Sequence, residues 1–158
     1  MVLFIGLWRF SMTVSTVPKY EHPASVRFFE TGIMDAPDYN GPNGSDIYPL
    51  VSVRRLSKGY KIWVIFSSKT EGHEVVLKTV DLKSKRLNLK RQINEPLRLD
   101  TLDKGFYDAY KVVFEGLDEA KFPPSVKDFD IIVDYEIDGQ AYDIAFNIVR
   151  REIGVPIH

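Results

Sequence analysis

The amino-acid sequence predicts an all-β protein, an antiparallel β-sandwich of about seven or eight strands with immunoglobulin-like or similar Greek-key connections. Short segments rich in β-branched and aromatic residues recur along the chain, and Gly, Pro, Asn and Asp separate them. Several of these segments alternate apolar and polar residues, which is the period of a half-buried strand. No long segment is convincing as an amphipathic helix. A small β-barrel is the structural alternative.

The length and composition are those of one compact domain, which we expect to span residues 1–158. Of the 158 residues, 44% are hydrophobic and 27% are charged, a mixture that excludes wholesale disorder, a coiled coil and a multi-span membrane protein. The absence of cysteine excludes disulfides, thiolate nucleophiles, iron–sulfur clusters and cysteine-built zinc sites. We favour a cytoplasmic location and keep membrane-anchored, periplasmic and extracellular locations as alternatives.

The N-terminal segment Met1–Trp8 is apolar, and Arg9 interrupts it. A membrane-spanning helix needs about 20 apolar residues, so this run is too short to span. Apolar and polar residues then alternate from Trp8 to Ser15, which favours a core strand from about Leu3 to Thr16. A membrane anchor or signal remnant, and a true start at Met12, are the alternatives.

The next part of the chain is rich in turn-forming residues. Pro18 and Pro23 flank a predicted polar connector, and Ser25–Glu30 has the composition of a short strand. The stretch Asp35–Pro49 consists mostly of turn formers and predicts a long irregular loop. Such a loop either carries function or is an insertion without one.

Two hairpins are predicted in the middle of the chain. Their strands are Leu50–Val53 with Tyr60–Phe66, and Glu74–Leu82 with Arg86–Ile93. Gly59 supplies the positive φ that a tight turn needs in the first hairpin. Lys83-Ser84-Lys85 joins the second pair, and Asn94-Glu95-Pro96 is expected to end it.

The segment Leu102–Leu117 fits two kinds of secondary structure. Its apolar residues follow helical spacing, but Tyr110–Phe114 is equally good strand sequence, and Gly105 and Gly116 bracket the segment. We favour a strand, followed by a connector from Leu117 to Val126.

The C-terminal hairpin has the clearest pattern in the chain. Odd positions from Phe129 to Ile137 are apolar, the alternating even positions are mostly acidic, and Asp138-Gly139 is a candidate type I′ turn. This turn predicts five inward pairs: Ile137 with Gln140, Tyr135 with Tyr142, Val133 with Ile144, Ile131 with Phe146, and Phe129 with Ile148. A slip of one residue would place acidic side chains in the core, so the register is strongly specified.

The formal net charge of −1 conceals two opposite blocks. Residues 51–100 hold twelve Lys/Arg and five Asp/Glu, a net +7, whereas residues 101–145 hold four and eleven, a net −7. The predicted partner-binding residues lie in these blocks: Asp130, Asp134, Glu136 and Asp143 on an acidic face, and Lys83, Lys85, Arg86, Lys90 and Arg91 on a basic hairpin. Trp63, with Lys61 on the same strand face, is a possible surface aromatic for a polyanion.

The predicted register creates an electrostatic problem on the outer face of the C-terminal hairpin. Asp134 faces Asp143, and directly opposed like charges destabilise a sheet pair. Solvent screening, a basic surface of this chain or of a partner, or a hard divalent cation could offset the repulsion. A metal ion is the least favoured of these, because strand-spaced carboxylates lack the loop wrapping that completes an oxygen site.

The sequence lacks the motifs of common catalytic and cofactor sites. There is no G-x-S-x-G elbow, HExxH pair, P-loop or dinucleotide fingerprint, and we assign no catalytic, cofactor-binding or metal residues. His73 lies beside Gly72 in a turn and is expected to be an exposed histidine without a structural role.

We therefore expect a non-enzymatic protein-interaction module, such as an adaptor, an accessory subunit or an immunity-type protein. Its partner would be another protein, bound through a charged sheet face, an edge strand or the loop at residues 35–49. The alternatives are a membrane-tethered extracytoplasmic domain and a binder of nucleic acid or another polyanion through the basic hairpin at residues 83–91.

Overall fold

The computed structural model describes residues 14–21, 45–102, 106–118 and 126–156, and every regular element in these ranges is a β-strand. The strands are β1 (Val14–Glu21), β2 (Ile47–Leu56), β3 (Gly59–Ser68), β4 (Glu74–Lys83), β5 (Asn88–Arg98), β6 (Asp100–Leu102), β7 (Phe106–Leu117), β8 (Asp128–Ile137) and β9 (Gln140–Pro156). They form two antiparallel sheets with the strand orders β1-β9-β8-β4-β5 and β2-β3-β7-β6.

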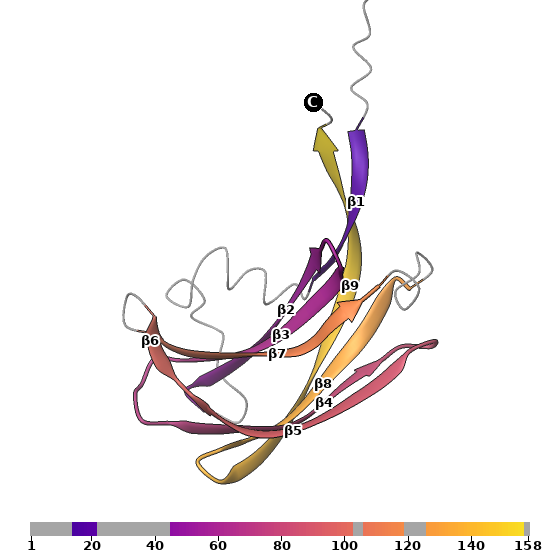
Figure 1. Ribbon diagram of the computed structural model, residues 1–158. Coiled ribbons are helices and arrows are strands. Elements are labelled where there is room, and N and C mark those ends of the chain that lie inside the picture. Colours follow the sequence, from indigo (N-terminus) through magenta and orange to yellow (C-terminus); the bar gives the residue numbers. More distant parts are fainter. Residues whose placement is uncertain (1–13, 22–44, 103–105, 119–125, 157–158) are drawn as a thin grey trace, which may run out of the picture.

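The two sheets lie as two layers, and β1 with the end of β9 extends beyond them as a two-stranded ribbon (Figure 1). The predicted all-β sandwich is confirmed, although the described ranges hold nine strands. The barrel alternative is wrong, because the sheets remain separate and each has its own edge strands.

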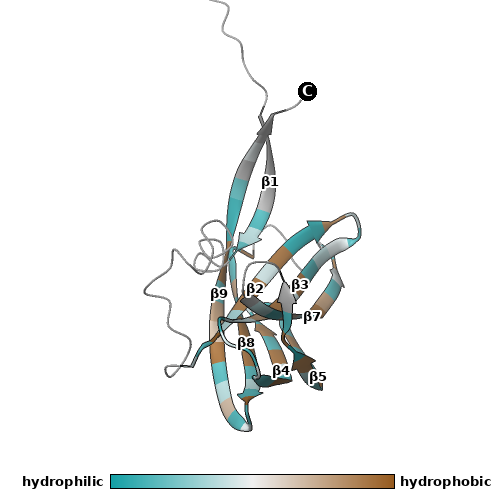
Figure 2. Cartoon of the chain, turned by 90° about the vertical axis from the view of Figure 1, so that its left-hand side faces the viewer, coloured by the Kyte–Doolittle hydropathy of each residue, from teal (hydrophilic) through white to brown (hydrophobic). Residues whose placement is uncertain are grey.

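The core lies between the sheets and takes alternate residues from their strands. Along β3, for example, Ile62, Val64 and Phe66 are fully buried, while the residues between them are partly exposed. Figure 2 shows hydrophobic and hydrophilic positions alternating along the strands. This alternation gives each sheet one face in the core and one face that can carry charge.

The first predicted hairpin is confirmed as β2 and β3. Leu56 pairs with Gly59, so Ser57 and Lys58 form a two-residue loop. Gly59 has a φ of +102°, and a Cβ added there would lie 2.7 Å from the carbonyl oxygen of Leu117. Both the backbone conformation and this close approach therefore require glycine. The strand interpretation of Leu102–Leu117 is confirmed for Phe106–Leu117, which forms β7 and pairs with β3, while Leu102 ends the separate short strand β6.

Two predicted loops are shorter than expected, because residues at their ends belong to strands. The expected loop Asp35–Pro49 ends earlier, because Ile47, Tyr48 and Pro49 are buried residues of β2. Of the expected connector between Pro18 and Pro23, Lys19 to Glu21 belong to β1, in which Pro18 pairs with Glu152. Pro18 and Pro49 both lie in edge strands, where alternate backbone N–H groups point away from the sheet and proline is therefore tolerated.

Several predictions lie partly or wholly outside the described residues. These are the anchor or strand at residues 1–13, the strand Ser25–Glu30, loop residues 35–44, and most of the connector after Leu117. Of the predicted strand Leu3–Thr16, Val14 to Thr16 are described and belong to β1. No helix in the described part of the chain is long and apolar enough to cross a membrane.

The C-terminal hairpin forms with the predicted register. All five predicted pairs are observed between β8 and β9, and Asp138 and Gly139 have φ values of 49° and 84° as a type I′ turn requires. The second predicted hairpin is confirmed as β4 and β5, but its predicted end at Asn94-Glu95-Pro96 is wrong. The strand β5 continues to Arg98 through an irregularity at which Asn94 adopts a φ of 48°.

Candidate functional site

The acidic and basic hairpins are neighbours in one sheet, because β4 pairs with β5 on one side and with β8 on the other. Lys83 pairs with Asp130 across this junction. The ammonium group of Lys78 also lies 3.2 Å from a carboxylate oxygen of Glu136. The two opposite charge blocks of the sequence therefore lie side by side on the first sheet and neutralise each other in part.

The four predicted acidic residues belong to the outer face of β8 and β9, and three of them have partners within the sheet. Asn147 donates a hydrogen bond to Asp130 over 3.0 Å, and the Thr79 hydroxyl donates one to Asp134 over 2.5 Å. Glu136 pairs with Lys78. Asp143 takes no hydrogen bond and no ion pair within the described ranges. The sequence patterns did not single out Thr79 or Lys78, because their alignment with β8 depends on the tertiary register.

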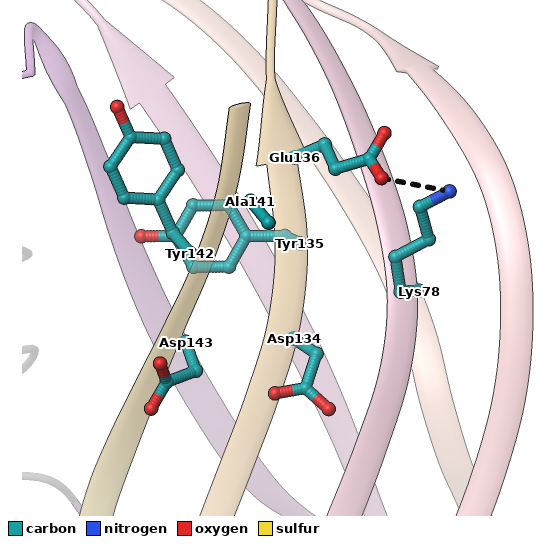
Figure 3. A pocket seen from close by; sticks show the side chains of 7 residues that line it. All are labelled: Lys78, Asp134, Tyr135, Glu136, Ala141, Tyr142 and Asp143. Atoms are coloured by element: carbon teal, nitrogen blue, oxygen red, sulfur yellow. Dashed lines mark ion pairs between the residues drawn. The ribbon is translucent and has the colours of Figure 1, made fainter. Parts of the chain in front are cut away.

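Asp134 and Asp143 lie directly opposite each other, as predicted, and their side chains are next to each other in Figure 3. They border an open depression of about 250 Å³. Its lining residues are Lys78, Asp134, Tyr135, Glu136, Ala141, Tyr142 and Asp143. Three carboxylates and one ammonium group give this lining a net negative charge. In the described ranges, these carboxylates and the other His, Asp and Glu side chains form no group of three or more that could hold a metal ion.

The five predicted basic residues do not form one surface. Lys83 and Lys90 flank Asp81, with nitrogen–oxygen distances of 3.8 and 3.9 Å. The Arg91 guanidinium instead donates a hydrogen bond over 2.8 Å to the carbonyl oxygen of Val113 in the other sheet. Arg91 therefore lies apart from Lys90, because alternate residues of β5 face opposite sides of the sheet.

Lys85 and Arg86 remain together in the β4–β5 turn, and the structure adds Lys127 from the residues before β8. These cations border a second depression, of about 190 Å³. Its lining residues are Ser84, Lys85, Arg86, Val126, Lys127 and Asp128. Lys127 lies in the acidic part of the sequence, so charge patterning alone did not associate it with the basic turn.

Trp63 lies on the outer face of the second sheet and is partly exposed. The charged groups of Lys61 and Arg54 lie 5.4 and 5.8 Å from its ring centroid, within the range of cation–π contacts. The ring thus already packs against cations of the protein itself. The neighbouring strand β7 presents Tyr110, which is 65% exposed.

The prediction that His73 has no structural role is wrong. Its Nδ1 donates a hydrogen bond to Asp138 over 2.9 Å, and its Nε2 lies 2.8 Å from the Thr70 hydroxyl. Asp138 also accepts a hydrogen bond from the backbone N–H of Glu74, and its own N–H donates to the carbonyl of Glu74. These bonds join the start of β4 to the β8–β9 turn.

Asp138 is electrostatically favoured as a carboxylate in this arrangement. The hydrogen bond from the Glu74 backbone, together with the His73 side chain, holds the pKa of Asp138 below its ordinary value. The side chains of Thr70, His73 and Asp138 contact one another in the same order, hydroxyl to imidazole to carboxylate, as the catalytic triad of a serine hydrolase. None of the three residues lines either of the two depressions, and we interpret the cluster as a clamp between turns.

Comparison of the chain with protein-family models, with curated proteins and with solved structures finds no significant match in any of the three.

Proposed function

We propose that this protein is a non-enzymatic interaction module that binds a protein partner through the outer face of β8 and β9. It would serve as an adaptor, an accessory subunit or an immunity-type protein. The observation that carries the proposal is the pair Asp134 and Asp143, which lie directly opposite each other beside a depression of about 250 Å³. Like charges in this position destabilise the pairing of two strands. A cationic group supplied from outside would relieve that repulsion.

The partner is expected to present an arginine or a lysine to this depression. Thr79 stabilises Asp134, whereas Asp143 has no compensating group within the described ranges. A guanidinium group can donate two parallel hydrogen bonds and is weakly hydrated, which suits a site lined by adjacent carboxylates. An arginine of the partner would therefore be the stronger anchor.

We also propose that the two sheets have an immunoglobulin-like or similar Greek-key topology. Long connections bring β7 beside β3 and β8 beside β4, which supports this kind of topology. Binding through a membrane tether at Met1–Trp8 stays a prediction, because that segment lies outside the described residues.

The test uses the full chain and the protein that co-purifies with it from its own cells. We expect the double variant Asp134→Asn with Asp143→Asn to weaken binding about tenfold or more, and the native affinity to fall as salt is raised from about 50 to about 500 mM. Titration calorimetry or interferometry measures both effects. Asn can still accept the hydrogen bond of Thr79, so the sheet is preserved.

Glu71→Gln is the matched control, because it removes an exposed carboxylate of the β3–β4 turn, away from the depression. This variant should bind the partner as the native protein does. Equal affinities of the double variant and the native chain would contradict the proposal.

A further inference from the structure

We propose that the depression between the β4–β5 turn and the start of β8 is a binding site for a phosphate group. The expected ligand is a dianionic phosphate, either free inorganic phosphate or the phosphomonoester of a modified side chain. This site differs in position and in charge from the acidic depression, and it does not depend on the function proposed above.

Cations from two separate parts of the chain meet at this site. Lys83 pairs with Asp130 in the antiparallel register of β4 and β8, so the turn after Lys83 continues alongside the residues before Asp130. Lys85 and Arg86 thereby come to line the same depression as Lys127. With Asp128 as the one carboxylate of the lining, the formal net charge of the site is +2.

The two lysines of the site, Lys85 and Lys127, differ from other lysines of the sheet in their pairing. Lys83 and Lys90 both have Asp81 within ion-pair distance. Lys85 and Lys127 have no ion pair within the described part of the chain. Their charges are therefore available to an anion without the loss of an existing salt bridge.

Hydrogen bonds hold both sides of the depression in place. On the turn side, the Ser84 N–H donates to Leu87 over 2.7 Å, and the Ser84 oxygen accepts bonds from the N–H groups of Arg86 and Leu87. The hydroxyl proton of Ser84 has no acceptor among the described residues, so it can be donated to a ligand.

The other side is anchored by bonds to neighbouring strands. The hydroxyl of Tyr20 donates to the carbonyl of Val126 over 2.9 Å, and the N–H of Arg150 donates to the carbonyl of Lys127 over 2.7 Å. Binding an anion would therefore order mainly the ends of the lysine and arginine side chains. A site with a fixed backbone loses less entropy on binding than a mobile loop.

The size and surroundings of the depression favour a phosphate group over an extended polyanion. Its volume of about 190 Å³ lies below the range of about 300–1,000 Å³ that encloses drug-sized ligands. It can enclose the anionic group and leave the remainder of the ligand outside. A protein that binds single-stranded nucleic acid without sequence preference also needs aromatic side chains along a basic groove, on which the bases stack. Trp63 belongs to the other sheet and packs against Lys61 and Arg54.

The experiment is a titration of the full ¹⁵N-labelled chain with inorganic phosphate and, separately, with N-acetyl-phosphoserine amide at constant ionic strength. We expect saturable shifts of the amide signals of Ser84 to Leu87 and Val126 to Asp128. The tighter ligand of the two identifies the source of the phosphate group, free or side-chain-borne. Shifts that do not saturate, or that match those caused by chloride, would overturn the proposal.

Variants separate the site from general electrostatic attraction. Lys85→Glu with Lys127→Glu, and the milder Lys85→Ala with Lys127→Ala, should each weaken phosphate binding about tenfold or more. Lys58→Glu removes an exposed lysine of the β2–β3 turn and should leave the affinity within about twofold. An equal loss in all three variants would show that only the net charge matters and would contradict a site.

Asp128→Asn gives the sharpest test. The carboxylate of Asp128 repels a dianion in the same depression, so the variant should bind phosphate a few-fold more tightly than the native chain. A weaker affinity would contradict the assigned arrangement, because it would mean that the carboxylate supports the ligand.

Discussion

The β8–β9 and β4–β5 hairpins lie side by side in one sheet, yet they handle their charges in different ways. In β8–β9, the acidic residues keep to the outer face, and Thr79, Asn147 and Lys78 compensate three of them. In β4–β5, two lysines flank Asp81, Arg91 reaches into the other sheet, and the turn keeps its cations at the surface. An unbroken alternation of apolar and polar residues thus concentrates charge on one face of the sheet. An interrupted alternation distributes the charge over both faces.

The interruption lies in the middle of β4. Val75 and Leu77 face the core at one end of the strand, while Val80 and Leu82 do so at the other, so the parity of the inward positions changes between them. The register against β8 shifts between Leu77 and Thr79. The extra residue, Lys78, is the one whose ammonium group reaches Glu136. The bulge thereby places a cation beside the acidic face.

The inward charges of β5 connect the two sheets. Besides the bond from Arg91 to Val113, Glu95 lies 2.6 Å from the ammonium group of Lys111 on β7. The strand β5 is an edge of its sheet. Inward-pointing charges on an edge strand discourage pairing with other chains, and here they also bind the facing sheet.

The largest expected effect tests the alternation of the acidic hairpin. Ile131→Thr should lower the free energy of unfolding by about 2–4 kcal/mol, because Ile131 is fully buried and the new hydroxyl would lie in an apolar core. Its neighbour Ile132 faces the outer side, and Ile132→Thr should cost less than about 1 kcal/mol. Urea unfolding of both variants measures the difference. Equal costs would contradict the assigned faces of β8.

A smaller effect tests the irregularity in the basic hairpin. Asn94→Val should lower the free energy of unfolding by about 1–2 kcal/mol, because a β-branched residue is strained at a φ of 48°. Asn88→Val is the control, since Asn88 is an exposed residue of the same strand without a positive φ. We expect this control to change stability by less than about 0.5 kcal/mol in the same denaturation experiment. If Asn94→Val were as stable as the native chain, β5 would have to pass residue 94 without a bulge.

The smallest effect tests the clamp that joins the two hairpins. Because the folded-state pKa of Asp138 is lowered, its carboxylate stabilises the fold above the unfolded value of about 3.9, and this contribution is lost as the pH falls through the folded-state pKa. Asp138→Asn keeps the bond from the Glu74 N–H and a residue that tolerates positive φ. It should cost less than about 1 kcal/mol at pH 7, since the Asp138 side chain is 51% exposed.

The pH dependence distinguishes this clamp from a simple loss of charge. Unfolding experiments from pH 7 to pH 2 should show the native chain and Asp138→Asn converging in stability below about pH 4. Glu71→Gln, which removes an exposed carboxyl group of the β3–β4 turn, is the control and should change stability at pH 7 by less than about 0.5 kcal/mol. A constant difference between native chain and Asp138→Asn at all pH values would argue against a role for the Asp138 charge.

The sequence predicted the C-terminal hairpin completely because two local signals agreed there. The turn Asp138-Gly139 fixed which residues face each other, and unbroken alternation fixed which face is buried. It misjudged Asn94 and Pro18 because turn-forming residues also occur in bulges and edge strands, and the neighbouring strands decide which of these forms.

The candidate sites were predictable only in part. The residues of the acidic face follow from the hairpin register, but their partners Thr79 and Lys78 depend on the pairing of β4 with β8. The sequence also grouped all basic residues from Lys83 to Arg91 and missed Lys127. Charge counting along the chain does not show the direction of a side chain or the identity of its neighbour on another strand.

By itself, the sequence determined an all-β chain, the faces of its most regular hairpin and the presence of two opposite charge blocks. Only the tertiary structure decided that these blocks lie side by side in one sheet, and that Lys85, Arg86 and Lys127 border one depression. The physical reason is that alternation and turn chemistry act between neighbouring residues. Strand order and bulges are instead set by the packing of two sheets around a common core.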